Sequence, residues 1–253
     1  MPAGLAKLVN FTSLNWNYET EPEPQLNNRR LYWPRGRVLG GSSSINAMCF
    51  IRGHRTDYDD WARAGNPGWG WDEVLPYFLR SQNQSRGASE LHGIGGPLSV
   101  EDLSYFNPLS EVFIQSAEQA GFAVNRDFNG PAQRGFGFYQ VTQRGGRRCS
   151  TAVGYLRPAR SRPNLTVKTG ALTLGIEFSG QRASGVRYQR RGITQTAHAT
   201  QEVLLAGGAI NSPQMLMLSG IGPAAELERA GIKVRHELPG VGANLQDHLD
   251  ICT

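Results

Sequence analysis

The sequence contains few cysteines and histidines, and neither type is arranged to hold a metal ion or a disulfide framework. Three cysteines occur among 253 residues, at positions 49, 149 and 252, far apart and without a C-x-x-C pair. An odd number at this spacing excludes a disulfide scaffold and argues against a zinc site. The five histidines are scattered without ligand spacing, so we expect no metal.

Long apolar runs are also missing. No stretch approaches the roughly 20 residues that a membrane-spanning helix needs. Lys7 interrupts the apolar segment near the N-terminus, residues 5–9, where a secretory signal would need a continuous apolar region. We therefore expect a cytoplasmic protein without a membrane span, while peripheral association with a membrane surface stays open.

Basic residues outnumber acidic ones, with a formal net charge of +5, but they do not cluster. No run of five or more basic residues occurs, and no set of aromatic residues is interleaved with the arginines. A nucleic-acid-binding protein would gather its basic residues on one surface. We favour solvated arginines, with one or two facing the diphosphate of a dinucleotide, over nucleic-acid binding.

The remaining composition is that of a globular protein, with 39% hydrophobic and 19% charged residues. A chain of this length can bury a sizeable core as one large domain or two small ones. Helical periodicity and cap residues predict helices at residues 57–64, 72–80, 108–120, 150–156, 211 onward and 224–230. Apolar and β-branched runs predict strands at residues 98–100, 135–141, 164–167, 172–178, 183–189, 194–199 and 202–206.

Some of these elements carry more specific expectations. Asp72 is expected to cap the second helix, and Ser212 with Pro213 to open the fifth. The strands between residues 164 and 199 are expected to form an antiparallel meander, and residues 202–206 a buried strand. Residues 45–51 fit either a buried helix or an extended segment.

The most informative segment is the glycine- and serine-rich run from Gly36 to Asn46, GRVLGGSSSIN. Glycine lacks the Cβ atom that would keep a ligand away from the backbone, and it tolerates positive φ. Successive N–H groups in such a loop form an anion-binding hollow, to which serine hydroxyls add donors. The run predicts a site for a phosphate or the edge of an electron-rich ring. For the glycines and serines alone, a plain surface turn stays the alternative.

A second segment places backbone donors at the start of a helix. Residues 202–206 run through Gly207 and Gly208 into the predicted helix, and this order directs free N–H groups and the helix dipole toward an anion. The G-x-G-x-x-A pattern at residues 220–225 is not counted as a dinucleotide fingerprint. It follows a helix rather than a strand, and it contains a proline.

Two runs of the chain resemble the signatures of one enzyme family. Residues 32–61 are similar to the first signature of the glucose–methanol–choline (GMC) oxidoreductases, and residues 208–222 are similar to the second. The resemblance implies an α/β fold of mixed helices and strands. It would comprise a partial Rossmann-like FAD-binding domain with an antiparallel β-meander and part of a substrate-binding domain. Residues 1–60 and 160–253 would then serve mainly FAD binding, and residues 61–159 mainly a substrate-domain or lid insertion.

The resemblance implies that an alcohol is oxidised to an aldehyde by hydride transfer to the N5 atom of FAD, in a manner similar to choline and primary alcohol dehydrogenases. Residue 45 is isoleucine, where some members carry a histidine bonded to the flavin, so noncovalent FAD is implied. Thr173 lies in a run that is similar to the strand pair whose backbone contacts adenine. Positions that match the flavin and diphosphate contacts are Val38, Ser42, Asn46, Ala47, Met48 and Cys49.

Parts of the family pattern are unmatched. No G-x-G-x-x-G precedes Tyr32, and the region of the family's catalytic histidine has no counterpart, so no catalytic residue is assigned. Asp247 and His248 resemble a structural loop of the family. We expect a central piece of a family member that by itself binds FAD weakly or not at all and has no turnover. A non-catalytic binding module that keeps part of the fold is the alternative.

The expected partners are a small-molecule alcohol and an electron acceptor, which could be oxygen, a quinone or another oxidant. The identity of the alcohol stays open, because no aromatic or acidic cage for a quaternary ammonium group can be assigned from the sequence.

Overall fold

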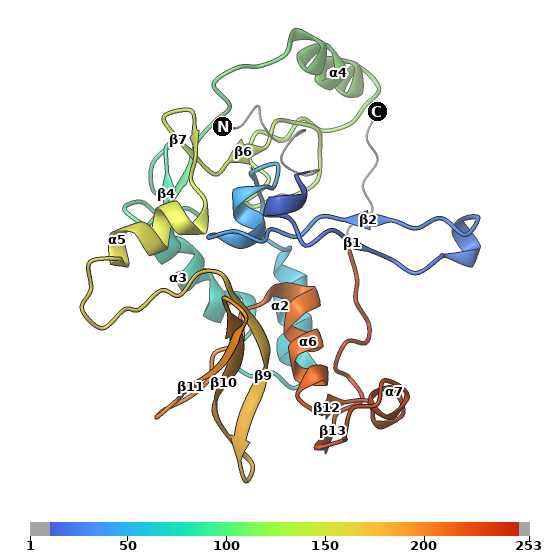
Figure 1. Cartoon of the computed structure of the whole chain (residues 1–253). Helices are drawn as coiled ribbons and strands as arrows, with labels where there is room; N and C mark the ends of the chain where they lie inside the picture. The colour runs from blue at the N-terminus through green and yellow to red at the C-terminus, as the bar shows by residue number, and fades with distance from the viewer. Residues whose placement is uncertain (1–10, 248–253) are drawn as a thin grey trace. The chain divides into compact units, whose positions relative to one another are not determined.

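The computed structural model describes residues 11–247 and divides the chain into two compact units, Met1–Leu165 and Thr166–Thr253. Both units mix helices with strands (Figure 1), as predicted. Residues 5–9, His248 and Cys252 lie outside the described residues. Within residues 11–247 no helix is both long and apolar enough to cross a bilayer. The assignment of residues 1–60, 61–159 and 160–253 to FAD and substrate regions stays a prediction.

Unit 1 is built from short elements joined by long connections. Its strands form two-stranded sheets, β1 with β2, β3 with β6, β4 with β5 and β7 with β8, of which the β4–β5 pair is parallel. In chain order the elements are η2 (Thr12–Leu14), β1 (Tyr18–Glu19), η3 (Pro24–Leu26), β2 (Tyr32–Trp33), η4 (Gly41–Ser44), β3 (Cys49–Phe50), α2 (Arg55–Arg63), α3 (Trp71–Ser81), β4 (Gln82–Gln84), β5 (Leu98–Val100), α4 (Pro108–Gln119), β6 (Gln140–Val141), β7 (Gln143–Arg144), β8 (Arg147–Arg148), η5 (Ala152–Leu156) and α5 (Arg157–Ala159).

An aromatic cluster centred on Tyr58 joins helices α2 and α3. The Tyr58 ring is buried, and its centroid lies 5.5 Å from that of Trp61 and 5.6 Å from those of Trp71 and Phe78. Such edge and tilted contacts add about 0.5–1.5 kcal/mol each beyond the area they bury. The Tyr58 hydroxyl also accepts the N–H of Gly53 at 3.1 Å, so the cluster fixes the segment that leads into α2.

The prediction that Asp72 caps α3 was wrong. The helix begins at Trp71, with Gly70 as its N-cap, and Asp72 lies inside the first turn. The Trp71 N–H donates to Asp59 Oδ1 at 2.9 Å, and Asp72 pairs with Arg55 at 2.9 Å instead. Both partners come from α2. The local capping contact is made by Glu73, whose Oε2 accepts the Gly70 N–H at 2.8 Å.

The predicted strand at residues 135–141 is mostly absent, since Gln140–Val141 alone forms a strand, β6. Phe136 instead makes an isolated bridge to Val124, with hydrogen bonds to the backbone of residues 123 and 125. A Cβ atom on Gly137 would lie 1.8 Å from the Asn125 carbonyl oxygen. This close approach, rather than a sheet, explains the glycines of the segment.

Polar side chains fill part of the interior of unit 1. Gln84 and Gln140 exchange amide hydrogen bonds at 2.7 and 3.0 Å, and both are buried. His92 Nδ1 lies 3.2 Å from the Gln82 amide nitrogen, and His92 Nε2 lies 2.8 Å from Asp127 Oδ2. Buried polar groups that are satisfied in this way specify one arrangement of the surrounding chain.

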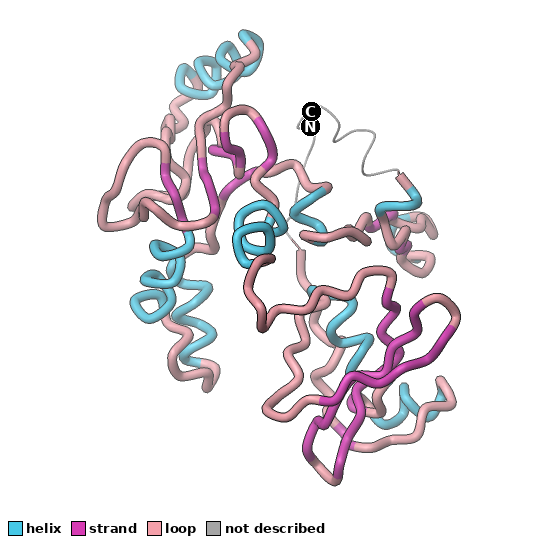
Figure 2. Tube along the Cα trace, turned by 60° about the vertical axis from the view of Figure 1, so that its left-hand side comes forward, coloured by secondary structure: helices cyan, strands magenta, loops and turns pink. Residues whose placement is uncertain are grey.

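Unit 2 contains the predicted antiparallel meander, in the order β11–β10–β9 (Figures 1 and 2). Helix α6 packs against β9, and Ser219, just after the helix, accepts the Ile176 N–H of β9 through its hydroxyl at 2.9 Å. The elements are β9 (Ala171–Ser179), β10 (Arg182–Arg190), β11 (Ile193–His198), α6 (Gly208–Leu218), β12 (Ile221–Gly222), α7 (Ala224–Arg229) and β13 (His236–Glu237).

Three further expectations for this region do not hold. Residues 164–167 and 202–206 are not strands, and Leu204 is 81% exposed. A strand needs a neighbour for its N–H and C=O groups, and no residue among 11–247 pairs with either segment. Helix α6 begins at Gly208, so Pro213 lies inside it, and Ser212 Oγ accepts the Gly207 N–H at 2.9 Å.

Candidate functional site

The glycine–serine run folds back on itself as a tight loop around η4. Gly40 and Gly41 have φ values of +89° and +53°, which favour glycine. The Gly36 N–H donates to Ser42 Oγ at 3.1 Å, and a Cβ atom on Gly36 would lie 2.3 Å from the Gly41 carbonyl oxygen. A Cβ atom on Gly41 would meet no atom within 4 Å, so one side of the loop is open.

Two serines of the loop use their hydroxyl protons within it. Ser43 Oγ donates to the Gly40 carbonyl at 2.5 Å, and Ser44 Oγ donates to the Leu39 carbonyl at 2.8 Å. A hydroxyl has one proton to donate, so the expectation that the serines add donors for a ligand does not hold for these two.

Six of the seven predicted cofactor residues lie along one continuous segment of unit 1. Val38, Asn46, Ala47 and Cys49 are exposed, Ser42 is half-buried and Met48 is buried. Ile45 is also buried, at 3% exposure. Residues 49–50 form strand β3, which resolves the choice between helix and extended chain in favour of the extended chain.

The seventh, Thr173, lies in unit 2, on strand β9. It is exposed and pairs with Tyr188 of β10.

Met48 holds an unusual backbone conformation at the end of the loop. Its φ is +67°, although it is neither glycine nor asparagine, and such a residue costs about 1–3 kcal/mol. Its N–H donates to Asn46 Oδ1 at 3.1 Å, and its carbonyl accepts the Thr142 N–H at 2.9 Å. Contacts on both sides of Met48 therefore maintain the strained turn.

Residues that sequence reasoning did not select hold the loop from the side of strand β8. Arg148 Nη1 donates to Asn46 Oδ1 at 2.8 Å and to the Ser43 carbonyl at 3.1 Å. The Thr151 N–H donates to Ser43 Oγ at 3.0 Å, and its hydroxyl donates to the Gly40 carbonyl at 3.2 Å. These partners lie more than a hundred residues away in sequence, and no local pattern pointed to them.

Arg148 is a partly buried cation whose remaining donors have no protein partner. Among the described residues, its Nε and Nη2 atoms are buried and make no hydrogen bond. Burial lowers the pKa of the Arg148 guanidinium, and an arginine in a protein nevertheless stays charged near neutral pH. The loop is thus backed by a positive charge.

A second region follows the predicted glycine turn and helix in unit 2. Helix α6 and the segment that contains Gly242 and Gln246 line a cavity of about 500 Å³. Pro213 and Met217 lie on its helical wall. Of the two family-like runs, only residues 208–222 contribute to this cavity.

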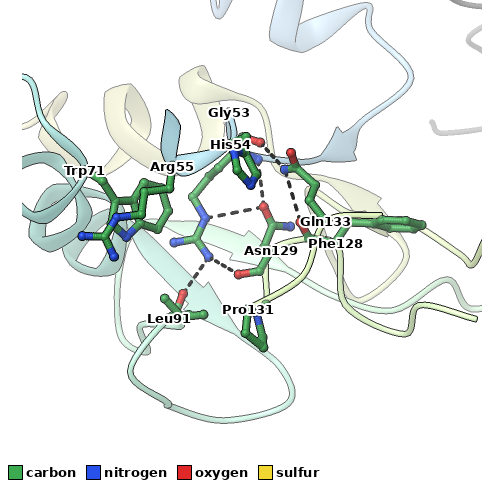
Figure 3. Close-up of a pocket in the computed structure, with 11 residues that line it drawn as sticks. Gly53, His54, Arg55, Trp71, Leu91, Phe128, Asn129, Pro131 and Gln133 are labelled. Atoms are coloured by element: carbon green, nitrogen blue, oxygen red, sulfur yellow. Dashed lines mark hydrogen bonds between the residues drawn. The ribbon is translucent and has the colours of Figure 1, made fainter. Parts of the chain in front are cut away.

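Another cavity, of about 280 Å³, lies in unit 1 beside Arg52 (Figure 3). Arg52 is only 6% exposed; its Nη2 donates to the Leu91 carbonyl at 2.6 Å and to the Asn129 carbonyl at 3.0 Å. Burial lowers the pKa of Arg52, and Asp127 and Tyr58 oppose that shift. None of the predicted cofactor residues lines this cavity.

The described residues contain no group of three or more His, Cys, Asp or Glu side chains that could bind a metal ion.

Comparison with known proteins places these features in one family. Residues 3–250 match the family described as GMC oxidoreductase. The chain is 49% identical to the alcohol dehydrogenase (acceptor) of Pseudomonas putida over 254 residues, which cover 99% of this chain and 46% of that protein. It is also 49% identical to mitochondrial choline dehydrogenase of Mus musculus over 251 residues, 99% of this chain and 42% of that protein.

Solved structures of an oxidase and of an FAD-dependent oxidoreductase also resemble this chain. The chain is similar to pyridoxine 4-oxidase from Mesorbium loti, with a TM-score of 0.89 and 34% identity over 94% of this chain and 47% of that one. It is also similar to an FAD-dependent oxidoreductase from Chaetomium thermophilum, with a TM-score of 0.84 and 31% identity over 90% of this chain and 42% of that one. The chain spans less than half the length of each of these proteins. It belongs to the GMC oxidoreductase family.

Proposed function

We propose that residues 1–253 form part of the FAD-binding region of an oxidoreductase that acts on the CH–OH group of an alcohol. The observation that carries the proposal is the loop of residues 36–46, which is open at Gly41 and is held by hydrogen bonds from Arg148 and Thr151. When bound, FAD supplies the hydride acceptor of the reaction. This chain's part is to bind and orient it.

The residues present fit such a group. The Asn46 side chain is exposed, and its amide nitrogen makes no hydrogen bond to any residue described here, so it can donate to a ring edge. The guanidinium of Arg148 adds positive charge behind the loop, which suits an anionic dinucleotide. Val38, Ser42, Asn46, Ala47, Met48 and Cys49 would contact the flavin and diphosphate, and the backbone at Thr173 would contact the adenine. Ile45 offers no nucleophile, so the cofactor is held noncovalently.

The small-molecule partner in this proposal is an alcohol, because the similar proteins from Pseudomonas putida and Mus musculus are named as alcohol and choline dehydrogenases. The proposal includes a cytoplasmic location and no nucleic-acid partner. The names of the similar proteins do not agree on the electron acceptor. The protein from Pseudomonas putida is named only with an unspecified acceptor, whereas a similar choline dehydrogenase from Brucella anthropi is called oxygen-dependent. The electron acceptor is therefore not part of the proposal.

The test uses the whole polypeptide that carries this chain. Purified protein should contain stoichiometric FAD that acid or heat releases, as a noncovalent cofactor would. Under anaerobic conditions, addition of primary alcohols or choline should bleach the visible absorbance of the flavin. Protein without flavin, or flavin that no alcohol reduces, would contradict the proposal.

A further inference from the structure

We propose that Arg148 is a positioning residue of the flavin site, which holds the Asn46 amide so that its NH₂ group faces outward to the flavin. The inference rests on the proposed function, because Asn46 is the residue assigned there to the flavin edge. Arg148 itself need not touch the cofactor.

The hydrogen-bond pattern allows one orientation of the Asn46 amide. Arg148 Nη1 lies 2.8 Å from Asn46 Oδ1, and a guanidinium can donate but not accept. The Met48 N–H, at 3.1 Å, donates to the same oxygen. A flipped amide would bring its own NH₂ group against both donors. Two donors on one oxygen therefore commit the NH₂ group to the opposite, exposed side.

Backbone pairing and a second hydrogen bond hold Arg148 in position to bind the Asn46 side chain. It lies on strand β8, where it pairs with Gln143 of β7, and its Nη1 atom also reaches the Ser43 carbonyl at 3.1 Å. The hairpin is joined to the loop at Thr142, which donates to the Met48 carbonyl. Arg148 thus links the β7–β8 hairpin to the loop and to the Asn46 side chain.

The neighbouring arginine offers a matched control. Arg147 lies on the same strand but is exposed, and no hydrogen bond or ion pair of its side chain occurs among the described contacts. Arg148→Met should be tolerated by the fold, because two of the three guanidinium nitrogens already lack partners. Replacing such a group by an apolar chain of similar length leaves few groups unsatisfied.

The experiment measures FAD affinity by titration of flavin-free protein and the midpoint potential of the bound flavin, in the whole polypeptide that carries this chain. Arg148→Met should weaken FAD binding by roughly tenfold or more, the factor that a hydrogen bond to a charged group supplies. Arg148→Lys, which keeps a cationic donor, should restore most of the affinity, and Arg147→Met should change nothing.

Coupling to Asn46 distinguishes positioning from a general effect of charge. Asn46→Ala should weaken binding and shift the potential. Adding Arg148→Met to it should cause a much smaller further loss than Arg148→Met causes alone, since only the contribution of the Arg148 charge is left to lose. Asn46→Asp keeps both accepted hydrogen bonds but replaces the outward donor by a carboxylate oxygen, so it should bind FAD at least as weakly as Asn46→Ala. This variant tests the inference even if Arg148→Met does not fold.

Fully additive effects of Asn46→Ala and Arg148→Met, or wild-type affinity of Asn46→Asp, would overturn the inference. Wild-type protein that binds no FAD would overturn the proposed function as well, and that failure is visible before any variant is made.

Discussion

Arg52 and Asn129 lie 77 positions apart in the sequence and contact each other through both backbone and side chain. The Arg52 N–H donates to Asn129 Oδ1 at 2.8 Å, and Arg52 Nη2 donates to the Asn129 carbonyl at 3.0 Å. The Asn129 amide nitrogen donates in turn to the Phe50 carbonyl at 3.0 Å. This pair joins the segment after the glycine–serine loop to the connection between α4 and β6.

Arg52→Met should destabilise the protein by about 2–4 kcal/mol, because it leaves the half-buried carbonyl of Leu91 and the buried carbonyl of Asn129 without the Arg52 donor. Arg55→Met is the control, since its exposed ion pair with Asp72 is worth below about 1 kcal/mol. Chemical denaturation measures both free energies of unfolding. Equal losses in the two variants would contradict the structural role of Arg52.

Gly36→Ala should distort the loop and weaken FAD binding, because its Cβ atom would meet the Gly41 carbonyl oxygen at 2.3 Å. Gly41→Ala meets open space, and its cost should stay near the roughly 1–2 kcal/mol of a left-handed residue. Flavin titration and unfolding curves compare the two variants. A loop that accepts alanine equally at both positions would argue against the close approach.

Leu227→Ala should cost about 2–5 kcal/mol, since Leu227 is fully buried at 0% exposure in unit 2. Leu204→Ala, at 81% exposure, should change stability by no more than about 0.5 kcal/mol. Hydrogen exchange read separately for the two units would show whether the loss is confined to Thr166–Thr253. A loss spread equally over both units would mean that they unfold together.

Acid should destabilise unit 1 through Asp102. The hydrogen bond from Arg86 is the main cause that holds the pKa of Asp102 below its usual 3.8. Burial acts in the opposite direction and raises this pKa, whereas a hydrogen bond from Gln140 lowers it further. A carboxyl whose pKa is lower in the folded state contributes stability above its unfolded pKa, and that contribution is lost as the pH falls through its folded value. Unfolding free energies should therefore decrease below about pH 4.

Asp102→Asn should remove part of this acid-dependent loss, and Arg86→Gln should reduce it by raising the pKa of Asp102. Urea denaturation between neutral and acidic pH checks both variants. An unchanged pH dependence in Asp102→Asn would show that other carboxyl groups account for the whole loss.

The local sequence pattern was sufficient to predict elements whose signals lie in consecutive residues. The meander of β9, β10 and β11 follows from alternating runs with short turns, and helix α4 follows from Pro108 and the glycine at position 121, whose φ is +88°. The glycine–serine loop was also recognisable in the sequence. The close backbone approach at Gly36 and the positive φ values at Gly40 and Gly41 favour glycine at these positions.

Contacts between distant segments decided the rest. The Trp71 N–H in the first turn of α3 donates to Asp59 of α2, and the strand expected at 202–206 has no partner within residues 11–247. The polar interior around His92 joins four separate segments, with Gln140 linked through Gln84. The periodicity of a sequence indicates which residues share one face of a helix or strand. It does not indicate which other element packs against that face.

The sequence by itself determined the family, the meander and the loop at residues 36–46, because each is written in consecutive residues. Only the tertiary structure decided that Arg148 and Thr151 clamp that loop and that Arg52 is buried against Asn129. Hydrogen bonds between residues 77 or more positions apart leave no local signature in the sequence, because they form only when folding brings those residues together.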